Sequence, residues 1–479
     1  MFSQFNFAKI YFISFLIFVI GSSTIASQEI VVRKDGSFLY SQDHSRTVCI
    51  ETFKPGQPIR AAGDYYLNNT GSNPALSVDT SSRAISLWNY MNIATLPASR
   101  SILCPSSMDM DGDGNKELVI SEAAGWSDTF WIYESLASND LYNLAHTLQF
   151  ASSSSAYPSD FGDSDNDSLK EILVYGRTSN DFWIRTYEET LPPSYPTNYA
   201  AQIVPYDNWW GEEARITDLD SDGLPEICYI SSSARRFSVN ETTGNNQYAE
   251  VYSVVFNQVS VLQDFAMADD LNGNGKKEVI LGGVPMLYIY ECSANNVYTE
   301  IWSVNTGLNA IEIIDTGDID GDNRRDFLLV GMGANYPDNA MRLQIYESNC
   351  DCEDDFDLIY ERVIDGGASG SSAAAIGDTK GNGSTDIGWQ VVGSNFMTFE
   401  LIKATDNNKF TVIWNRTISK PPTVALYGVV SIGDVNENGK DEILFNEYKL
   451  VNGQNWTGTK IYEWRKKIVA EEEVEQTMK

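Results

Sequence analysis

One short acidic loop recurs seven times along this 479-residue chain, and the repeat limits what the chain can fold into. The loops begin at intervals of 54, 55, 52, 48, 60 and 56 residues, and an apolar, β-rich run follows each loop directly. A repeat of this length is typical of arrays in which every unit is one supersecondary motif. The first to seventh loops begin at Asp109, Asp163, Asp218, Asp270, Asp318, Asp378 and Asp434.

The interval between two loops has a constant internal pattern, which is clearest between Gly282 and Asp318. Short strands are predicted at residues 286–290, 298–304 and 311–314, and the last of them leads into the next loop. Helical periodicity is nearly absent. Four short strands per repeat, separated by turn residues, are the pattern of a propeller blade. The sequence therefore predicts an all-β, seven-bladed β-propeller with four-stranded blades and calcium-binding loops.

The two ends of the array complement each other. Trp88 lies 21 residues before the first loop and Trp414 lies 20 before the seventh, so residues 85–92 fit a fourth strand that lacks the first three. The C-terminal repeat, which ends near Trp464, has three strands and lacks the fourth. We expect these segments to share one blade, because ring closure removes the exposed sheet edges that favour aggregation.

The N-terminus carries one cation, Lys9, before an apolar run from Ile10 to Ile20. This pattern predicts a secretory signal peptide. An uncleaved membrane anchor is the competing interpretation, but the run is shorter than the roughly 20 residues of a spanning helix. No later stretch is apolar enough to span a bilayer, so we expect a secreted, extracellular and monomeric protein. The predicted segments are 1–26, the signal peptide; 27–84, an N-terminal extension; 85–465, the propeller; and 466–479, a polar C-terminal tail.

The excess of acidic residues bears on which partners the protein can bind. Asp and Glu total 66 against 33 Lys and Arg, and this formal net charge of -33 would repel phosphate backbones, so nucleic acid is not expected as a partner. Positions 1, 3, 5 and 9 of the seven loops hold 22 of the 66 acids, so bound cations would neutralise much of the charge. Six cysteines in an exported chain allow up to three disulfides, and none has the spacing of a zinc site.

The first loop, 109–117, has carboxylates at positions 1, 3, 5 and 9, and a glycine at position 6 that permits a tight turn. Calcium accepts about six to eight oxygen ligands in variable geometry, whereas magnesium requires a stricter octahedron. An EF-hand is not predicted, because its closing glutamate comes later and helices flank it. We predict bound Ca²⁺, with acidic surface turns that bind no metal as the alternative. The predicted ligands are Asp109, Asp111, Asp113, Asn115, Glu117, Asp163, Asp165, Asp167, Glu171, Asp218, Asp220, Asp222, Glu226, Asp270, Asn272, Asn274, Glu278, Asp318, Asp320, Asp322, Asp326, Asp434, Asn436, Asn438 and Glu442.

The loops differ in quality. The second has Ser168 at position 6, and the fifth has Asn323 there, which enters left-handed conformations more easily than most residues. The fourth and seventh loops have asparagine at positions 3 and 5, so weaker binding is predicted. In the sixth loop Lys380 occupies position 3, where its ammonium would take the place of an ion, and this site is predicted to be empty or weak.

With the strand that follows each loop and glycine motifs such as 282–285 and 331–333, the loops resemble the FG-GAP or VCBS repeats of integrin alpha-subunit N-terminal β-propellers and of related bacterial exported proteins. The resemblance covers about four fifths of the chain. It implies calcium loops between the first two strands on one propeller face and ligand binding on the other face. The Phe-Gly and Gly-Ala-Pro signatures are mostly absent and there is no membrane-spanning segment, so an integrin subunit is excluded and adhesion is an analogy.

The opposite face would consist of the loops that enter each first strand and those between second and third strands. Exposed aromatic side chains in these loops suit sugar rings or peptide segments, because they offer flat apolar area with polar edges. Packing between blades is the competing interpretation for each of them. The predicted ligand-binding residues are Trp126, Trp209, Trp210, Tyr336 and Trp456.

A catalytic function has little support. The chain has only two histidines, His44 and His146, and neither lies near a nucleophile motif. The acidic loops account for nearly every clustered carboxylate, so no catalytic residue is assigned. We therefore predict an extracellular recognition or adhesion module for carbohydrate or protein. The alternatives are a calcium-dependent propeller polysaccharide lyase or hydrolase, and a purely structural surface component.

Overall fold

A computed structural model describes residues 30–32, 38–40, 76–79, 84–103, 108–122, 129–135, 141–149, 155–177, 182–190, 194–203, 211–333, 340–349, 355–365, 371–424, 426, 428–451 and 454–470. The predicted signal peptide lies outside these residues. Within them, no helix has the length and apolarity that crossing a membrane requires.

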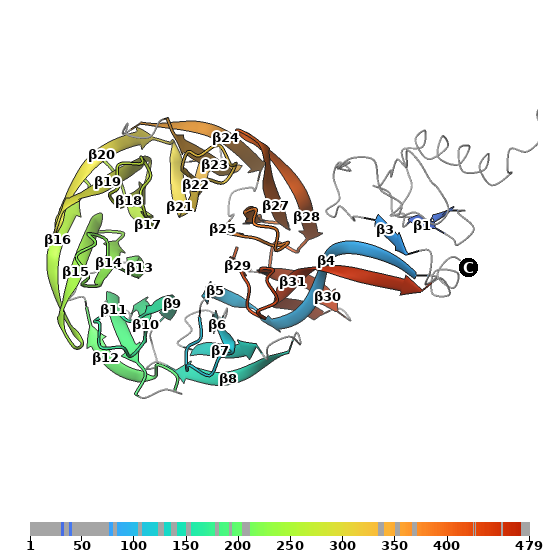
Figure 1. The fold of residues 1–479 in the computed structure, drawn as a ribbon, viewed down its shortest axis with the longest axis horizontal. Helices are drawn as coiled ribbons and strands as arrows, with labels where there is room; N and C mark the ends of the chain where they lie inside the picture. Colours follow the sequence, from blue (N-terminus) through green and yellow to red (C-terminus); the bar gives the residue numbers. More distant parts are fainter. Residues whose placement is uncertain are drawn as a thin grey trace, which may run out of the picture. The chain divides into compact units, whose positions relative to one another are not determined.

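Seven antiparallel sheets surround a common axis and form the blades of a β-propeller (Figure 1). The first blade has strands β5 (Ser99–Leu103), β6 (Lys116–Glu122), β7 (Thr129–Ser135) and β8 (Tyr142–Gln149). The second has β9 (Ser155–Gly162), β10 (Glu171–Arg177), β11 (Phe182–Glu188) and β12 (Asn198–Gln202). The third has β13 (Gly211–Thr217), β14 (Glu226–Ser231), β15 (Arg236–Gly244) and β16 (Gln247–Val255). The prediction of an all-β, seven-bladed ring is confirmed.

The remaining blades repeat the same order of strands. The fourth has β17 (Leu262–Ala268), β18 (Glu278–Gly283), β19 (Met286–Ala294) and β20 (Val297–Asn305). The fifth has β21 (Leu308–Gly317), β22 (Asp326–Gly333), β23 (Ala340–Ser348) and β24 (Phe356–Asp365). The sixth has β25 (Ser371–Gly377), β26 (Asp386–Val392), β27 (Phe396–Asp406) and β28 (Lys409–Ser419). The seventh begins with β29 (Val430–Gly433), β30 (Glu442–Val451) and β31 (Gln454–Ala470).

The seventh blade is completed by an N-terminal strand. Its sheet has the order β29-β30-β31-β4-β3, in which β4 (Ala84–Pro97) is the fourth strand and β3 (Leu76–Asp79) is added outside it. Beside β31, the Asn92 side-chain amide donates to the carbonyl oxygen of Ile461 at 3.0 Å. The predicted joining of the two ends in one blade is confirmed, and it brings together residues about 370 positions apart.

The hydrophobic core lies between neighbouring blades. Every residue of the second strands β14, β18 and β26 is buried, because adjacent blades cover both faces of these strands. The fourth strand β16, at the rim, alternates between exposed and half-buried residues. Across blades, Phe237 lies edge-on to Phe265 with ring centroids 5.6 Å apart, and Phe399 stacks on Phe445 at 4.3 Å. Cys228 is free and fully buried in this core.

The chain divides into two compact units. The ring unit consists of Asn92–Thr411 and Thr417–Tyr462, and the other of Met1–Met91, Val412–Arg416 and Glu463–Lys479. In the second unit, β1 (Ile30–Val32) pairs with β2 (Phe38–Tyr40), and β3 pairs with the start of β4. Tyr90 there contacts Trp414 and Trp464, with ring centroids 5.0 and 4.9 Å apart. The extension predicted at 27–84 thus contains strands.

Strand direction determines where the acidic loops lie. Successive strands of a blade are antiparallel, so the connections between strands 1 and 2 and between strands 3 and 4 emerge at the same end of the sheet. The acidic loops all connect first and second strands, from Asp109 between β5 and β6 to Asp434 between β29 and β30. The connections between second and third strands, and between blades, emerge at the opposite end. The loops therefore gather on one face of the ring.

Candidate metal centre

All seven acidic loops have the same backbone conformation. The residue at position 6 has a positive φ in each, although three residue types occur there: Gly114 (95°), Ser168 (74°), Gly223 (89°), Gly275 (85°), Asn323 (71°), Gly383 (80°) and Gly439 (81°). Position 4 is also left-handed in every loop, which the sequence did not indicate: Gly112 (75°), Asn166 (64°), Ser221 (62°), Gly273 (75°), Gly321 (87°), Gly381 (65°) and Glu437 (58°). The two left-handed residues curl the loop around its side chains.

Hydrogen bonds within each loop fix the acids at positions 1 and 9. In the third loop, the backbone N–H of Gly223 donates to Asp218 Oδ2 at 3.2 Å, and that of Leu219 donates to Glu226 Oε2 at 2.7 Å. The bond from position 6 to position 1 is present in all seven loops. That from position 2 to position 9 is present in six, and in the sixth loop the Thr379 hydroxyl donates instead.

The predicted ligands converge in the first three loops. Position 1, 3 and 9 carboxylates each offer one oxygen, and these oxygens lie within 4.8 Å of one another. The acid at position 9 is buried, and its second oxygen has no hydrogen-bond partner in six loops: Glu117 Oε1, Glu171 Oε1, Glu226 Oε1, Glu278 Oε1, Asp326 Oδ1 and Asp386 Oδ1. A buried carboxylate oxygen without a donor is costly, and a hard cation would satisfy it. The residues present therefore fit a calcium ion.

The electrostatics of these loops lead to the same conclusion. Burial raises the pKa of Glu226, the hydrogen bond from Leu219 opposes this rise, and the carboxylates of Asp220 and Asp218 add to it, so that the pKa is about 8. Burial likewise raises the pKa of Glu117, Glu171, Glu278 and Asp326 to about 8. Each of these acids is thus ionised at neutral pH only at a cost, which a bound cation would offset.

A second acid that the sequence analysis missed faces the loop in five blades. It lies in the last part of the third strand, directly opposite the acid of position 9 across the sheet, as Glu241 lies opposite Glu226. In the third loop, one oxygen each of Asp220, Asp222 and Glu241 lies within 4.8 Å of the others. In the second loop the same holds for Asp167, Glu171 and Glu188, which are the acids of positions 5 and 9 and the acid of the third strand. We call these acids the third-strand glutamates: Glu134, Glu188, Glu241, Glu291 and Glu347.

The sixth loop differs at both of its key positions. Lys380 occupies position 3, and Lys403 takes the place of the third-strand glutamate, opposite Asp386. Burial raises the pKa of Asp386, whereas the Thr379 hydroxyl and the charges of Lys380 and Lys403 oppose this rise. Two ammonium groups near one closing acid supply the positive charge that an ion would supply elsewhere. Asp386 Oδ1 nevertheless has no hydrogen-bond partner, as in the other loops, so the prediction that this site is empty or weak stays a prediction.

In three other loops, a predicted asparagine ligand donates a hydrogen bond to a neighbouring acid. In the fourth, Glu291 accepts hydrogen bonds from Asn274 and from Lys276, and these donors lower its pKa. In the first, the Asn115 amide donates to Asp113 Oδ2 at 3.0 Å, so this predicted ligand positions another one. In the seventh, the acid at position 9 accepts at Oε1 from the Asn436 amide at 2.8 Å.

Most of the aromatic residues predicted to bind a ligand fall outside the part of the chain that the structure describes. Trp126, Trp209, Trp210 and Tyr336 lie outside the described residues. Trp456 lies on β31, opposite Lys449 of β30. His146 lies on the fourth strand β8 and stacks on Tyr195 with ring centroids 5.6 Å apart. The prediction of a ligand-binding face therefore stays a prediction.

No family model matches the chain, and no curated protein matches it. Among solved structures, a chain of the Chaetomium thermophilum Polycomb Repressive Complex 2 aligns with a TM-score of 0.51 at 7% identity, over 78% of this chain and 98% of that one. A functionally unknown protein from Desulfotomaculum acetoxidans aligns with a TM-score of 0.43 at 12% identity, over 73% of this chain and 100% of that one. At such identity a likeness shows the fold alone, and the resemblance to FG-GAP repeats stays a prediction.

Proposed function

We propose that this chain is a secreted, calcium-stabilised β-propeller that acts as an extracellular recognition or adhesion module for a carbohydrate or protein. The observation that carries the proposal is the buried, unpartnered oxygen of the position 9 acid, which recurs in six loops. A single acidic turn has little weight, because Asp, Asn and Gly are common in surface turns. The same unsatisfied oxygen in six loops favours a shared ligand, and in the sixth loop the charges of Lys380 and Lys403 act on that acid instead.

Calcium is the cation that this donor set favours. The ligands are all oxygens, from carboxylates and amides, and no histidine or cysteine takes part. The loops vary in the number of charged ligands, which suits an ion that tolerates six to eight oxygens in irregular geometry. Binding by several loops would also offset much of the net charge of -33. The cation is thus assigned a structural role, and recognition is assigned to the opposite face.

The recognition role rests on the division of the ring into two faces. One face carries the acidic loops, whereas the connections between second and third strands and between blades emerge at the other. These connections vary in length and sequence on a rigid scaffold, which is where binding residues concentrate in other folds. The predicted residues Trp126, Trp209 and Trp210 belong to them. Secretion, which the N-terminal apolar run predicts, would place this face among extracellular ligands.

Thermal melts with calcium and with a chelator test the metal. A cation at about 100 times its Kd stabilises the folded state by about 2.7 kcal/mol per site, so calcium should raise the Tm by several degrees. Glu226→Gln should reduce this increment and raise the Tm in chelator, because it removes a buried charge beside Asp218 and Asp220. The control Glu300→Gln changes the same charge on the exposed rim and should leave the increment intact. An unchanged melt after complete metal removal would refute calcium stabilisation.

Binding to a panel of glycans and matrix proteins tests recognition. We expect a specific ligand in calcium and weaker binding in chelator. The variant Trp209→Ala with Trp210→Ala should lose the ligand and keep the calcium-dependent melt. The control Tyr199→Ala, which removes an aromatic side chain 57% exposed on the outer strand β12, should keep both. Absence of any ligand across the panel would leave a purely structural surface component as the better hypothesis.

A further inference from the structure

Three hairpin tips in the ring carry an Asn-Asn pair, which we call the Asn-Asn turns. They connect third and fourth strands and consist of Asn245–Asn246, Asn295–Asn296 and Asn407–Asn408. The second asparagine of each is left-handed, with φ of 56°, 57° and 55°. Glycine would fit this conformation with less strain. The turn conformation alone therefore does not account for the asparagine side chains.

Each Asn-Asn turn contacts an acidic loop of the preceding blade. At the third loop, the backbone N–H of Asn296 donates to Asp220 Oδ2 at 2.8 Å, and the Asn295 amide donates to Asp222 Oδ2 at 2.5 Å. The Asn296 amide also donates to Glu241 Oε2 at 3.0 Å. One turn of the fourth blade thus donates to positions 3 and 5 and to the third-strand glutamate of the third blade.

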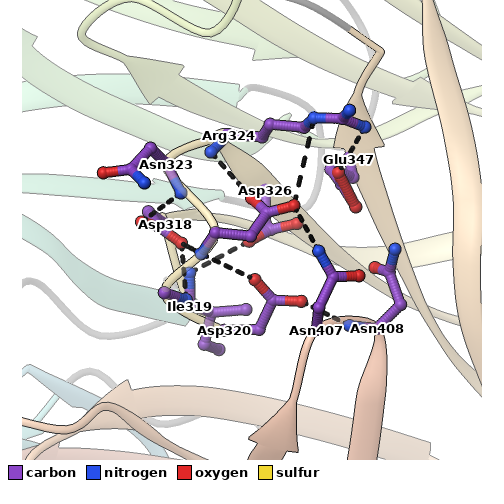
Figure 2. Close-up of polar contacts among 11 residues, drawn as sticks. Asp318, Ile319, Asp320, Asn323, Arg324, Asp326, Glu347, Asn407 and Asn408 are labelled. Atoms are coloured by element: carbon purple, nitrogen blue, oxygen red, sulfur yellow. Dashed lines mark hydrogen bonds and ion pairs between the residues drawn. The ribbon is translucent and has the colours of Figure 1, made fainter.

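The same three contacts occur at the second and fifth loops. At the second, Asn246 N–H donates to Asp165 at 2.5 Å, its amide donates to Glu188 at 2.8 Å, and the Asn245 amide donates to Asp167. Figure 2 shows the fifth loop, where Asn408 N–H donates to Asp320 at 2.6 Å and the Asn407 amide donates to Asp322 at 2.7 Å. The Asn408 side chain bonds to Glu347 there. The same three hydrogen bonds occur between three pairs of consecutive blades. This recurrence favours a common role for the Asn-Asn turns over a chance contact.

These donors act on carboxylates that the loop already holds from the other side. Asp220 Oδ1 accepts the N–H of Asp222 at 3.2 Å, and Asp222 Oδ1 accepts that of Leu224 at 2.9 Å. The turn bonds to the Oδ2 atom of each, so both side chains are fixed before a cation arrives. A carboxylate oxygen has two lone pairs and can accept a hydrogen bond while it binds a metal. Neutral amide donors also reduce the repulsion among the acids without occupying the site with charge.

We propose that the Asn-Asn turns are positioning residues supplied by the following blade, which couple cation binding at the second, third and fifth loops to the junction between consecutive blades. This inference rests on the proposed calcium function. Ligands held in place from a second shell bind metal more tightly, commonly by about 10- to 100-fold. Coupling is reciprocal, so the cation strengthens the blade junction by the same factor that the turn strengthens cation binding.

The test removes one turn and follows calcium binding and melting of the full chain. Asn295→Ala with Asn296→Gly deletes both amides and keeps a residue that adopts the left-handed conformation. Calcium affinity at one site should fall about tenfold in titration calorimetry, and the calcium-dependent rise in Tm should shrink. The control Asn305→Ala removes an exposed asparagine whose Oδ1 accepts the N–H of Gly307 at 3.0 Å on a connection between blades. This control should leave calcium affinity unchanged.

The same turn variant in a chain whose third loop cannot bind calcium separates coupling to cation binding from a simple loss of stability. When Asp220→Asn and Asp222→Asn have disabled the third loop, the turn variant should no longer change the calcium-dependent rise in Tm, because coupled sites are not additive. The inference is overturned if the turn variant lowers the Tm equally with calcium and with chelator, or if calcium affinity rises. A wild-type chain without any calcium-dependent rise would instead overturn the calcium function itself, which distinguishes the two failures.

Discussion

Two lysines set the sixth loop apart from the others. Lys380 replaces the position 3 carboxylate and Lys403 replaces the third-strand glutamate, and the charges of both oppose the rise that burial causes in the pKa of Asp386. The rest of the loop is retained: the Asp378 carboxylate accepts the N–H of Gly383, and φ of Gly383 is 80°. Backbone and metal chemistry are thus separable at this site. The fold keeps the turn even where the residues disfavour an ion.

Restoring the two acids should therefore create a calcium site. We expect Lys380→Asp with Lys403→Glu to add one bound calcium in titration calorimetry and to enlarge the calcium-dependent rise in Tm, because the variant gains an acid at position 3 and a third-strand glutamate opposite Asp386. In chelator the variant should be less stable than the wild type, since it adds two acids beside Asp378 and Asp386. The exposed Lys449, on β30, gives a control, Lys449→Asp, that changes charge away from any loop. An unchanged number of bound ions would contradict the role given to the lysines.

At the scale of elements, a residue within an acidic loop can be predicted from the sequence, whereas a residue brought to the loop by strand pairing cannot be predicted without the register of the sheet. The left-handed residue at position 6 could be predicted because glycine marks it in most loops, whereas position 4 is filled by Gly, Asn, Ser or Glu and gave no common signal. The third-strand glutamates were missed for a different reason. Glu117 lies opposite Glu134, and Asp326 lies opposite Glu347, so the pairing is constant while the hairpins between them differ in length. A search for Tyr-Glu at the end of each third strand would have found most of them.

The innermost strands show a second use of acids that no local pattern predicts. A carboxylate of one blade accepts a backbone N–H from the first strand of the next blade: Asp160 from Ile216 at 2.9 Å, Asp264 from Ile313 at 2.6 Å and Glu312 from Ala374 at 2.6 Å. These bonds satisfy the edge of each first strand, which has no strand partner on that side. The sequence could not reveal them, because the partners are about 50 to 60 residues apart.

Glu312 makes this arrangement sensitive to pH. Burial raises its pKa to about 8 from 4.5, the hydrogen bond from Ala374 opposes the rise, Glu213 adds to it and Arg215 opposes it. Because the folded pKa is the higher one, the folded state binds the proton more tightly. The proton on Glu312 therefore stabilises the folded state. This stabilisation is complete below pH 4.5 and is lost as pH rises through about 8.

Glu312→Gln should remove this pH dependence while it keeps an acceptor for the N–H of Ala374. Melts of both proteins in saturating calcium, between pH 5 and 8, give the difference in Tm between wild type and variant. That difference should move steadily in favour of the variant as pH rises, because only the wild type then carries an ionised acid there. A constant difference across this range would show that Glu312 does not titrate in the folded state.

At the scale of the whole molecule, the ring depends on one junction between its first and last blades. Asn446 of β30 is fully buried and bridges to β5: its amide donates to the Ser99 carbonyl at 2.6 Å, and its Oδ1 accepts the Ser99 N–H at 3.2 Å. The Thr459 hydroxyl donates to the same Oδ1 at 3.0 Å. The partners are 347 residues apart, so these bonds form only when the ring closes. The first and last blades are therefore joined by specific hydrogen bonds as well as by apolar packing.

Asn446→Ala should consequently destabilise the ring more than an ordinary loss of an asparagine. It leaves the Ser99 N–H and carbonyl buried without partners, at about 1–3 kcal/mol for each group, so the Tm should fall by several degrees in calcium and in chelator alike. Asn92→Ala provides a matched control, because Asn92 also bonds across the closing blade, to Ile461 at 3.0 Å, but lies at an exposed position where water replaces the lost bond. If the two variants melted at the same temperature, burial would not govern the closing contact, and the apolar packing between first and last blades would have to hold the ring closed without it.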